Sequence, residues 1–316
     1  MLVIDTSPVI IEASMNPAET FAQSGAILLG LTTPLYNGQR LDVPPRTVLQ
    51  PEIRVAPLRP PIDGFRYQAE ITGVPRHVVR WRIQMPPTLP PGSRGWVAGN
   101  VYAKKLKRLI AALAQWNRST GVEVDPRHEQ VLADIPDGEA CTLVFRCHPG
   151  FEALHHHTYH HELQHVADHI WLTRQILGRW DAILEEMHRE GKIVVGRRGT
   201  DVADLGSLFS YSRDTRAIFS YWWTAMKRSG FKFHGTEEGA SPVARVVDVA
   251  GNTVVVELRI RRLITRPPDL VHAAPHGDFQ VRGCDISGSE ADLSYGTPEK
   301  LRFRLVPVRS PFYTIA

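Results

Sequence analysis

Apolar and polar positions alternate along the first part of the chain. Over residues 65–84, "FRYQAEITGVPRHVVRWRIQ", they alternate on both sides of Gly73-Val74-Pro75. A period of two predicts half-buried strands, and the glycine and proline predict a break, so we expect two strands here. The rest of residues 1–95 is punctuated by proline, as in "DVPPR" and "MPPTLPPGS". The pattern therefore predicts a proline-rich, β-containing amino-terminal region.

The middle of the chain, residues 96–240, follows a helical period. Apolar residues recur every three or four positions over residues 101–117, 151–190 and 202–229. This spacing predicts amphipathic helices. Between the first two, the apolar run "CTLVFRC" at 141–147 predicts a short strand. The middle of the chain is therefore predicted to be mainly helical, with one strand ahead of the longest helix.

Strand-like alternation returns in the last part of the chain. The stretch "VARVVDVAGNTVVVELRIRRLI" predicts a hairpin around Ala250-Gly251-Asn252, and "KLRFRLVPV" predicts a last strand. We therefore expect an α+β fold, in which a zincin-like helical core stands between two β-rich regions. The three predicted parts are residues 1–95, 96–240 and 241–316.

Composition narrows the class of protein. The chain has 316 residues, of which 43% are hydrophobic, enough for at least one sizeable core. Its formal net charge is only +4, and its densest basic run, "KKLKR", is typical of a solvated helix face, so we expect no nucleic-acid partner. The amino terminus is acidic where a signal peptide is neutral or basic, and no apolar run is long enough to span a bilayer. We expect synthesis in the cytoplasm, no membrane span, and any export to use dedicated machinery.

One stretch concentrates metal-binding residue types. "YHHELQHVADH", residues 159–169, contains His161-Glu162-Leu163-Gln164-His165, which fits H-E-x-x-H. On a helix, residues i and i+4 lie about 6 Å apart on one face, so both histidines can reach one ion. In metallopeptidases the glutamate of this motif polarises or deprotonates water on a zinc ion. The spacing predicts a Zn²⁺ site with His161 and His165 as ligands and Glu162 as general base.

The neighbouring histidines fit a metal site less well. Eight of the 14 histidines lie between residues 148 and 169, but only His161 and His165 combine the i, i+4 offset with a glutamate after the first histidine. His169 is about 12 Å from His161 along a helix axis, too far to share an ion. We expect His169, like Asp168, either to support the ligands from behind or to lie exposed. The run 155–157 is expected to be a solvated helix start, with lining of the approach to the site as the alternative.

A catalytic zinc needs a third protein ligand. If the helices at 151–190 and 202–229 pack antiparallel about the turn and linker predicted at 191–200, the next segment returns to the level of the motif. That segment, "FKFHGTEEGA", follows the helix end predicted at Gly230. It offers three candidate ligands: His234, Glu237 and Glu238.

Two other placements of the third ligand stay open. Glu185 stands twenty residues after His165, a spacing similar to that of the thermolysin-like peptidases, but it reaches the ion only if the chain turns back at Gly178. Its neighbour Glu186 shares that condition. Asp204, in "GTDVAD", approaches the aspartate-ligand segment of other zinc peptidases, although a helix N-cap is the favoured interpretation of this segment.

The order of these motifs resembles a known family. H-E-x-x-H, a helical hairpin and a segment ending in H-G-x-x-x-G-A are similar to a bacterial family of predicted zinc-dependent proteases of unknown function. The resemblance covers residues 140–240 and implies a peptidase with His234 as third ligand. The matching residues are His161, Glu162, His165, His234, Gly235, Gly239 and Ala240.

The sequence thus leads to a hypothesis of a zincin-like metallopeptidase that hydrolyses peptide bonds in a protein or peptide substrate. The developing negative charge in such a reaction needs an electrophilic partner, for which Tyr211, Tyr221 and His188 are candidates. One alternative is a non-catalytic, histidine-rich metal-binding protein that stores or senses metal. A further possibility, compatible with a peptidase, is a secreted effector or toxin with secretion machinery or an immunity protein as partner.

Overall fold

The structure is a computed structural model, and the parts of the chain that it describes are bounded as follows: residues 1–12, 17–24, 28–41, 52–62, 65–86, 93–116, 124–149, 154–190, 192–195, 213–272, 284–287, 290–294 and 300–304.

Helices and strands alternate in these parts without a simple repeat. The helices are α1 (Pro17–Ser24), α2 (Ala103–Trp116), α3 (Pro126–Asp134), α4 (Leu154–Glu190) and α6 (Arg213–His234). The strands are β1 (Leu2–Ile4), β2 (Val9–Glu12), β3 (Leu31–Tyr36), β4 (Gln39–Arg40), β5 (Glu52–Ile62), β6 (Phe65–Gly73), β7 (His77–Met85), β8 (Gly95–Tyr102), β9 (Ala140–Cys147), β10 (Lys192–Val195), β11 (Val243–Ala250), β12 (Thr253–Arg259), β13 (Cys284–Ser287), β14 (Glu290–Ser294) and β15 (Lys300–Arg304). The mixed α+β class predicted from the sequence is confirmed.

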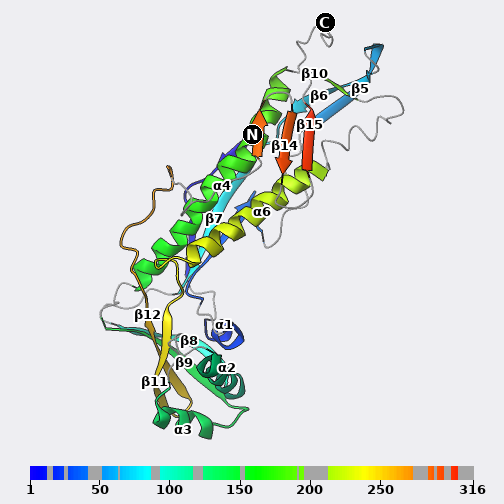
Figure 1. The fold of residues 1–316 in the computed structure, drawn as a ribbon. Helices are drawn as coiled ribbons and strands as arrows, with labels where there is room; N and C mark the ends of the chain where they lie inside the picture. Colours follow the sequence, from blue (N-terminus) through cyan, green and yellow to red (C-terminus); the bar gives the residue numbers. More distant parts are fainter. Residues whose placement is uncertain are drawn as a thin grey trace.

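Strand β7 organises the sheet that lies beside the long helices. It pairs in parallel with β1 and β2 and antiparallel with β3, and β3 continues into β4. The alternation predicted for this segment is present, because Val79, Trp81 and Ile83 are fully buried while the residues between them are partly exposed. Helix α4 contacts β1, β3 and β7. The sheet thus brings β3 against the helix that carries the H-E-x-x-H motif, and Figure 1 shows β7 alongside that helix.

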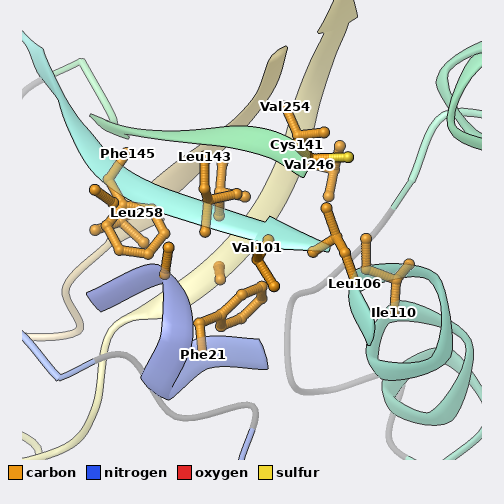
Figure 2. Close-up of a cluster of buried hydrophobic side chains, with 14 of the residues drawn as sticks. Phe21, Val101, Leu106, Ile110, Cys141, Leu143, Phe145, Val246, Val254 and Leu258 are labelled. Carbon is orange, nitrogen blue, oxygen red and sulfur yellow. The ribbon is translucent and has the colours of Figure 1, made fainter. Parts of the chain in front are cut away.

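A second sheet forms the other end of the elongated molecule. Its strand order is β11-β12-β9-β8, and helices α1, α2 and α3 lie beside it (Figure 1). Figure 2 shows its core, in which Phe21 of α1 and Leu106 of α2 pack toward Leu143 and Phe145 of β9. The parallel pairing of β9 with β12 joins the predicted middle and carboxy-terminal parts of the chain in one sheet.

Helices α4 and α6 form the expected antiparallel hairpin. Two buried hydrogen bonds fix their register: Trp222 Nε1 donates to Thr173 Oγ1 at 2.9 Å, and Ser229 Oγ donates to Asp168 Oδ2 at 2.7 Å. Asp168 is fully buried, and burying a carboxyl without hydrogen bonds costs free energy. The hydrogen bond from Ser229 reduces that cost and so favours this register. The register therefore carries the end of α6 back beside the first half of α4.

Two details of this hairpin concern glycines: the continuous helix predicted at 151–190 is confirmed over Leu154–Glu190, whereas the predicted end of the second helix is not. Gly178 does not interrupt α4, which runs without a break for 37 residues. The prediction that the second helix stops at Gly230 is wrong, because α6 continues to His234. A glycine inside a helix costs about 1 kcal/mol relative to alanine, and burial of Ser229 and Phe233 on either side outweighs that cost.

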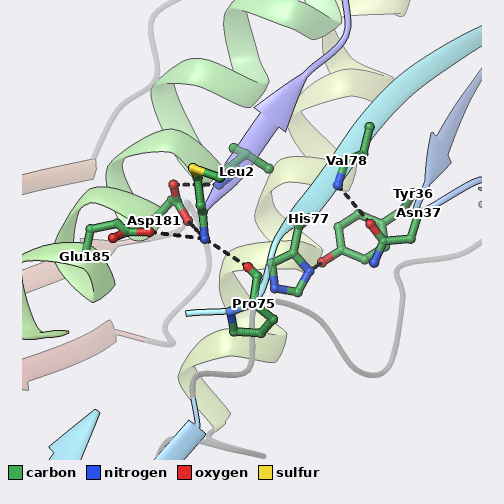
Figure 3. A network of polar contacts seen from close by, with 9 residues as sticks. Leu2, Tyr36, Asn37, Pro75, His77, Val78, Asp181 and Glu185 are labelled. Atoms are coloured by element: carbon green, nitrogen blue, oxygen red, sulfur yellow. Dashed lines mark hydrogen bonds and ion pairs between the residues drawn. The ribbon is translucent and has the colours of Figure 1, made fainter. Parts of the chain in front are cut away.

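The far end of α4 is attached to the first strand (Figure 3). Asp181 Oδ2 accepts a hydrogen bond from the backbone N–H of Leu2 at 2.7 Å, and Glu185 forms an ion pair of 3.3 Å with the amino group of Met1. Beyond α4, Lys192–Val195 of the predicted linker forms β10 and pairs with β6. This end of α4 is therefore occupied by structural contacts.

The remaining strand predictions are confirmed where the structure describes them. Strands β6 and β7 flank the predicted break at Gly73-Val74-Pro75, and β11 and β12 form a hairpin with Gly251 at a φ of 54°. A positive φ suits glycine because it has no Cβ. None of the helices in the described part of the chain is long and apolar enough to cross a bilayer.

Candidate metal centre

Three histidine side chains meet where the end of α6 passes α4. His161 and His165 lie one turn apart on α4, and His234 lies in the last turn of α6. Their Nε2 atoms form a nearly equilateral triangle, with distances of 3.2 Å between His161 and His165, 3.3 Å between His161 and His234, and 3.1 Å between His165 and His234. The hairpin register thus brings together the three histidines that the sequence analysis selected.

The spacing of these nitrogens fits a metal ion. Tetrahedral ligands at about 2.0–2.1 Å from zinc are about 3.3 Å from one another, close to the three observed distances. A neutral imidazole has one nitrogen that donates and one that accepts, so three converging Nε2 atoms cannot all satisfy one another by hydrogen bonds. A shared cation would satisfy all three.

The electrostatics of the three rings also suit metal binding. Burial is the main cause that lowers the pKa of His161 to about 3, and the pKa values of His165 and His234 are lowered by burial too. Metal ligation needs the neutral imidazole. These histidines are therefore held in the ligand form at neutral pH.

Contacts behind the ligands hold their orientation. The His161 ring donates a hydrogen bond to the backbone carbonyl of Glu238. Phe233 packs on two of the ligand rings, with centroids 4.8 Å from His161 and 5.2 Å from His165. A Cβ at Gly239 would lie 2.6 Å from the backbone carbon of Phe233, so this glycine allows the chain to fold closely over the end of α6. The "HGTEEGA" segment thus closes around the histidines.

Glu162 lies between the metal-ligand candidates and strand β3. Its side chain is only 4% exposed, and the hydroxyl of Thr32 donates to its Oε2 at 2.7 Å. A Cβ at Gly30 would lie 2.6 Å from Glu162 Cγ, so only glycine leaves room for the carboxyl here. Burial raises the pKa of Glu162 to about 7. The carboxyl is therefore fixed in orientation and can exchange a proton near neutral pH.

All four side chains line one cavity of about 660 Å³. Its wall is mainly apolar, with Leu31 from β3 and Met226 and Phe231 from α6. Strand β3 forms one side of it, and within the described residues β4 pairs with only Leu35 and Tyr36 of that strand. The backbone of residues 31–33 therefore has one edge directed away from β7 and beside the cavity.

The other histidines near the start of α4 do not belong to the group of three candidate ligands. His156 is exposed, as expected of a solvated helix start. His157 is buried and lines the cavity, so the alternative of lining the approach holds for this residue. The backbone of Ile264 is bound on both sides, because His157 Nδ1 accepts from its N–H and His160 Nδ1 donates to its carbonyl, each at 3.0 Å.

His169 and Asp168 support the site from behind and are not exposed. His169 is 8% exposed and donates to the backbone carbonyl of Met226, and burial lowers its pKa to about 4. Asp168 accepts from Ser229 and, at 2.8 Å, from Gln164. Both side chains therefore help to attach α6 to α4.

The other candidates for the third ligand do not belong with the three histidines in a group that could share one ion, or lie outside the described residues. In an unbroken α4, Glu185 and Glu186 are about 30 Å from His165, and Glu185 binds the amino group of Met1. Glu238 forms an ion pair of 3.3 Å with Arg262, and Glu237 is exposed. Asp204 lies outside the described residues. In the described part of the chain, the group of side chains close enough to share one ion is formed by His161, His165 and His234.

The residues that position the carboxyl of Glu162 could not be predicted from the sequence. Thr32 of β3 and Gly30, which directly precedes β3, lie about 130 positions away from Glu162, and no motif marks them. Of the three candidate electrophiles, His188 is about 40 Å from His161 along α4. Tyr211 and the side chain of Tyr221 lie outside the described residues.

Comparisons of the chain with protein-family models, with curated proteins and with solved structures find no match. The function must therefore be inferred from the geometry of the side chains.

Proposed function

We propose that the protein is a zinc-dependent peptidase with a zincin-like core, in which His161, His165 and His234 hold the ion and Glu162 is the general base. The observation that carries this proposal is a buried carboxyl beside three Nε2 atoms that are spaced like zinc ligands. Catalytic zinc sites combine three protein ligands with one open position. The cavity beside the histidines provides space for that position.

Glu162 performs the proton transfers of the proposed reaction. Zinc, when bound, would act as a Lewis acid that polarises the substrate carbonyl and lowers the pKa of water. Hydrolysis of a peptide bond needs a base for the attacking water and an acid for the leaving nitrogen, and a group with a pKa near the working pH serves both. The pKa of Glu162, raised to about 7, meets that need. The hydrogen bond from Thr32 keeps the carboxyl in one orientation for both transfers.

Strand β3 supports a peptide as the substrate. Residues 31–33 line the cavity beside Glu162, and their pairing with β7 uses only one edge of the strand. An extended peptide can add to such an edge through main-chain hydrogen bonds. The apolar wall would bury side chains of that peptide, which stabilises binding.

A metal store or sensor is supported less well. Such a protein needs several ligand sets, and the described residues contain one, formed by His161, His165 and His234. Among the described residues, His157 and His160 do not complete another, because neither belongs to a group of three candidate ligands close enough to share one ion. A store also gives no reason to bury Glu162 in the cavity beside the ligands.

The test compares two glutamate variants. Elemental analysis should find one zinc per chain in the wild type and in Glu162→Gln, because the glutamate is not a ligand. Hydrolysis of unfolded casein should be about 10² times slower in Glu162→Gln, since the general base is lost. The matched control Glu129→Gln, which changes an exposed residue of α3, should keep the wild-type rate. An unchanged rate in zinc-loaded Glu162→Gln would remove the mechanism.

A further inference from the structure

His157 lines the cavity, and a hydrogen bond to one nitrogen of its ring fixes which nitrogen carries the proton. Its side chain is 5% exposed, and it lines the same wall as Glu162 and the three candidate ligands. The backbone N–H of Ile264 donates to its Nδ1 at 3.0 Å. A backbone N–H can only donate, so Nδ1 carries no proton and Nε2 of the neutral ring carries it. Within the described parts of the chain, Nε2 has no hydrogen-bond partner.

The orientation of this ring is set before any ligand binds. His160 Nδ1 donates to the carbonyl of Ile264 at 3.0 Å, so Ile264 is held by two side chains of α4. Of these two histidines, only His157 is among the described residues that line the cavity. The two histidines can therefore be compared, because both attach Ile264 and only His157 also lines the cavity.

The position of His157 relative to the candidate metal centre matches the repeat of an extended peptide. The ring centroids of His157 and His161 are 6.2 Å apart. Carbonyls on one side of an extended chain repeat at every second residue, about 6.8 Å. A peptide whose scissile bond lies beside His161 would therefore bring a carbonyl two residues away to His157.

We propose that His157 is a substrate-binding residue whose Nε2–H donates a hydrogen bond to the carbonyl oxygen of the substrate residue two positions from the scissile bond. This inference rests on the proposed peptidase function and narrows its substrates. The substrate must be an extended peptide that continues for at least two residues on one side of the bond. Dipeptides cannot reach His157 and are poor substrates.

The experiment combines substrate length with variants of the two histidines. Peptides are built around a cleavage site found in casein digests and lengthened by one residue at a time at each end. In the wild type, kcat/KM should rise about tenfold when the residue that supplies the carbonyl is added on one side, the worth of one hydrogen bond. His157→Ala should lose this step, and His160→Ala should keep it.

The outcomes separate this inference from the proposed function. If the same step persists in His157→Ala, the inference is wrong and the peptidase stands. If zinc-loaded wild type cleaves no peptide of any length, the proposed function fails and the inference fails with it.

A binding measurement tests the role of His157 without substrate turnover. It can also be made if His157→Ala does not fold, because it uses protein in which His157 is intact. Zinc-loaded Glu162→Gln protein, with His157 intact, is titrated by calorimetry with two versions of the longest peptide. One keeps the amide whose carbonyl faces His157, and the other has an uncharged alkene in its place. The alkene peptide should bind about tenfold more weakly. Equal affinities of the two peptides would overturn the inference.

Discussion

At the scale of single residues, the candidate site depends on the absence of a side chain at position 30. In Gly30→Ala the new Cβ would collide with the Glu162 carboxyl. We expect this variant to bind zinc normally and to hydrolyse casein at least about tenfold more slowly, because a displaced base is out of reach of its proton. The control Gly138→Ala adds a Cβ with no atom within 4 Å and should keep full activity. Full activity in Gly30→Ala would show that Glu162 need not occupy its present position.

His169 makes stability depend on pH. Burial lowers its pKa from 6.5 to about 4, so between these values the unfolded chain binds a proton that the folded chain does not. Stability from this histidine is therefore present above pH 6.5 and is lost as the pH falls. In His169→Gln, which cannot take up that proton, the loss between pH 7.5 and pH 6 should be about 1 kcal/mol smaller than in the wild type.

Urea unfolding of the metal-free proteins at both pH values measures this difference. The glutamine amide keeps a donor for the carbonyl of Met226 that His169 binds, so the comparison isolates the charge. An identical pH dependence in the two proteins would mean that His169 titrates normally in the fold.

At the scale of secondary structure elements, local sequence patterns predicted α4 correctly but did not predict where α6 ends. His161, Glu162 and His165 share one helical face through short spacings, which a sequence displays directly. The end of α6 was misplaced because Gly230 resembles a helix stop, whereas packing of Ser229 and Phe233 carries the helix onward. The end of α6, which depends on packing against α4, was therefore predicted incorrectly.

The register between α4 and α6 should depend on the hydrogen bond between Ser229 and Asp168. In Ser229→Ala the fully buried Asp168 loses a donor, which should lower the free energy of unfolding by about 1–3 kcal/mol. Zinc affinity should fall too, since His234 follows Ser229 by little more than one turn. Thr224→Ala, an exposed change on the same helix, should stay within about 0.5 kcal/mol of wild type. A Ser229→Ala protein with wild-type stability would contradict this account of the register.

At the scale of the whole molecule, no local sequence pattern predicted which contacts join the three predicted parts. Thr32 and Gly30 reach Glu162 only because β3 pairs with β7 against α4, and Phe21 of α1 packs 6.3 Å from Phe145 of β9 between ring centroids. Such contacts join residues far apart in the chain and leave no local pattern. The candidate ligands could be predicted, but the carboxyl's surroundings and the role of His157 could not.

The contacts between the predicted parts of the chain lead to a prediction for limited proteolysis. The stretch 85–95, of which residues 87–92 lie outside the described residues, is rich in proline and glycine and should be cut first. The two fragments should then remain together in gel filtration, because β7 and α1 from the first fragment contact α4 and β8 of the second. Separation of the fragments without denaturant would show that these contacts are weak, and protection of the stretch would argue for one fused domain.

The central claim is that three histidines from two helices hold one zinc ion, and a competition titration of zinc against a chromophoric chelator tests it most directly. Wild type should bind one zinc per chain, and His234→Ala should lose affinity by at least about 10²-fold, since one of three protein ligands is gone. His156→Ala, an exposed change on α4, should bind like the wild type. Equal zinc affinity in His234→Ala and the wild type would contradict the account.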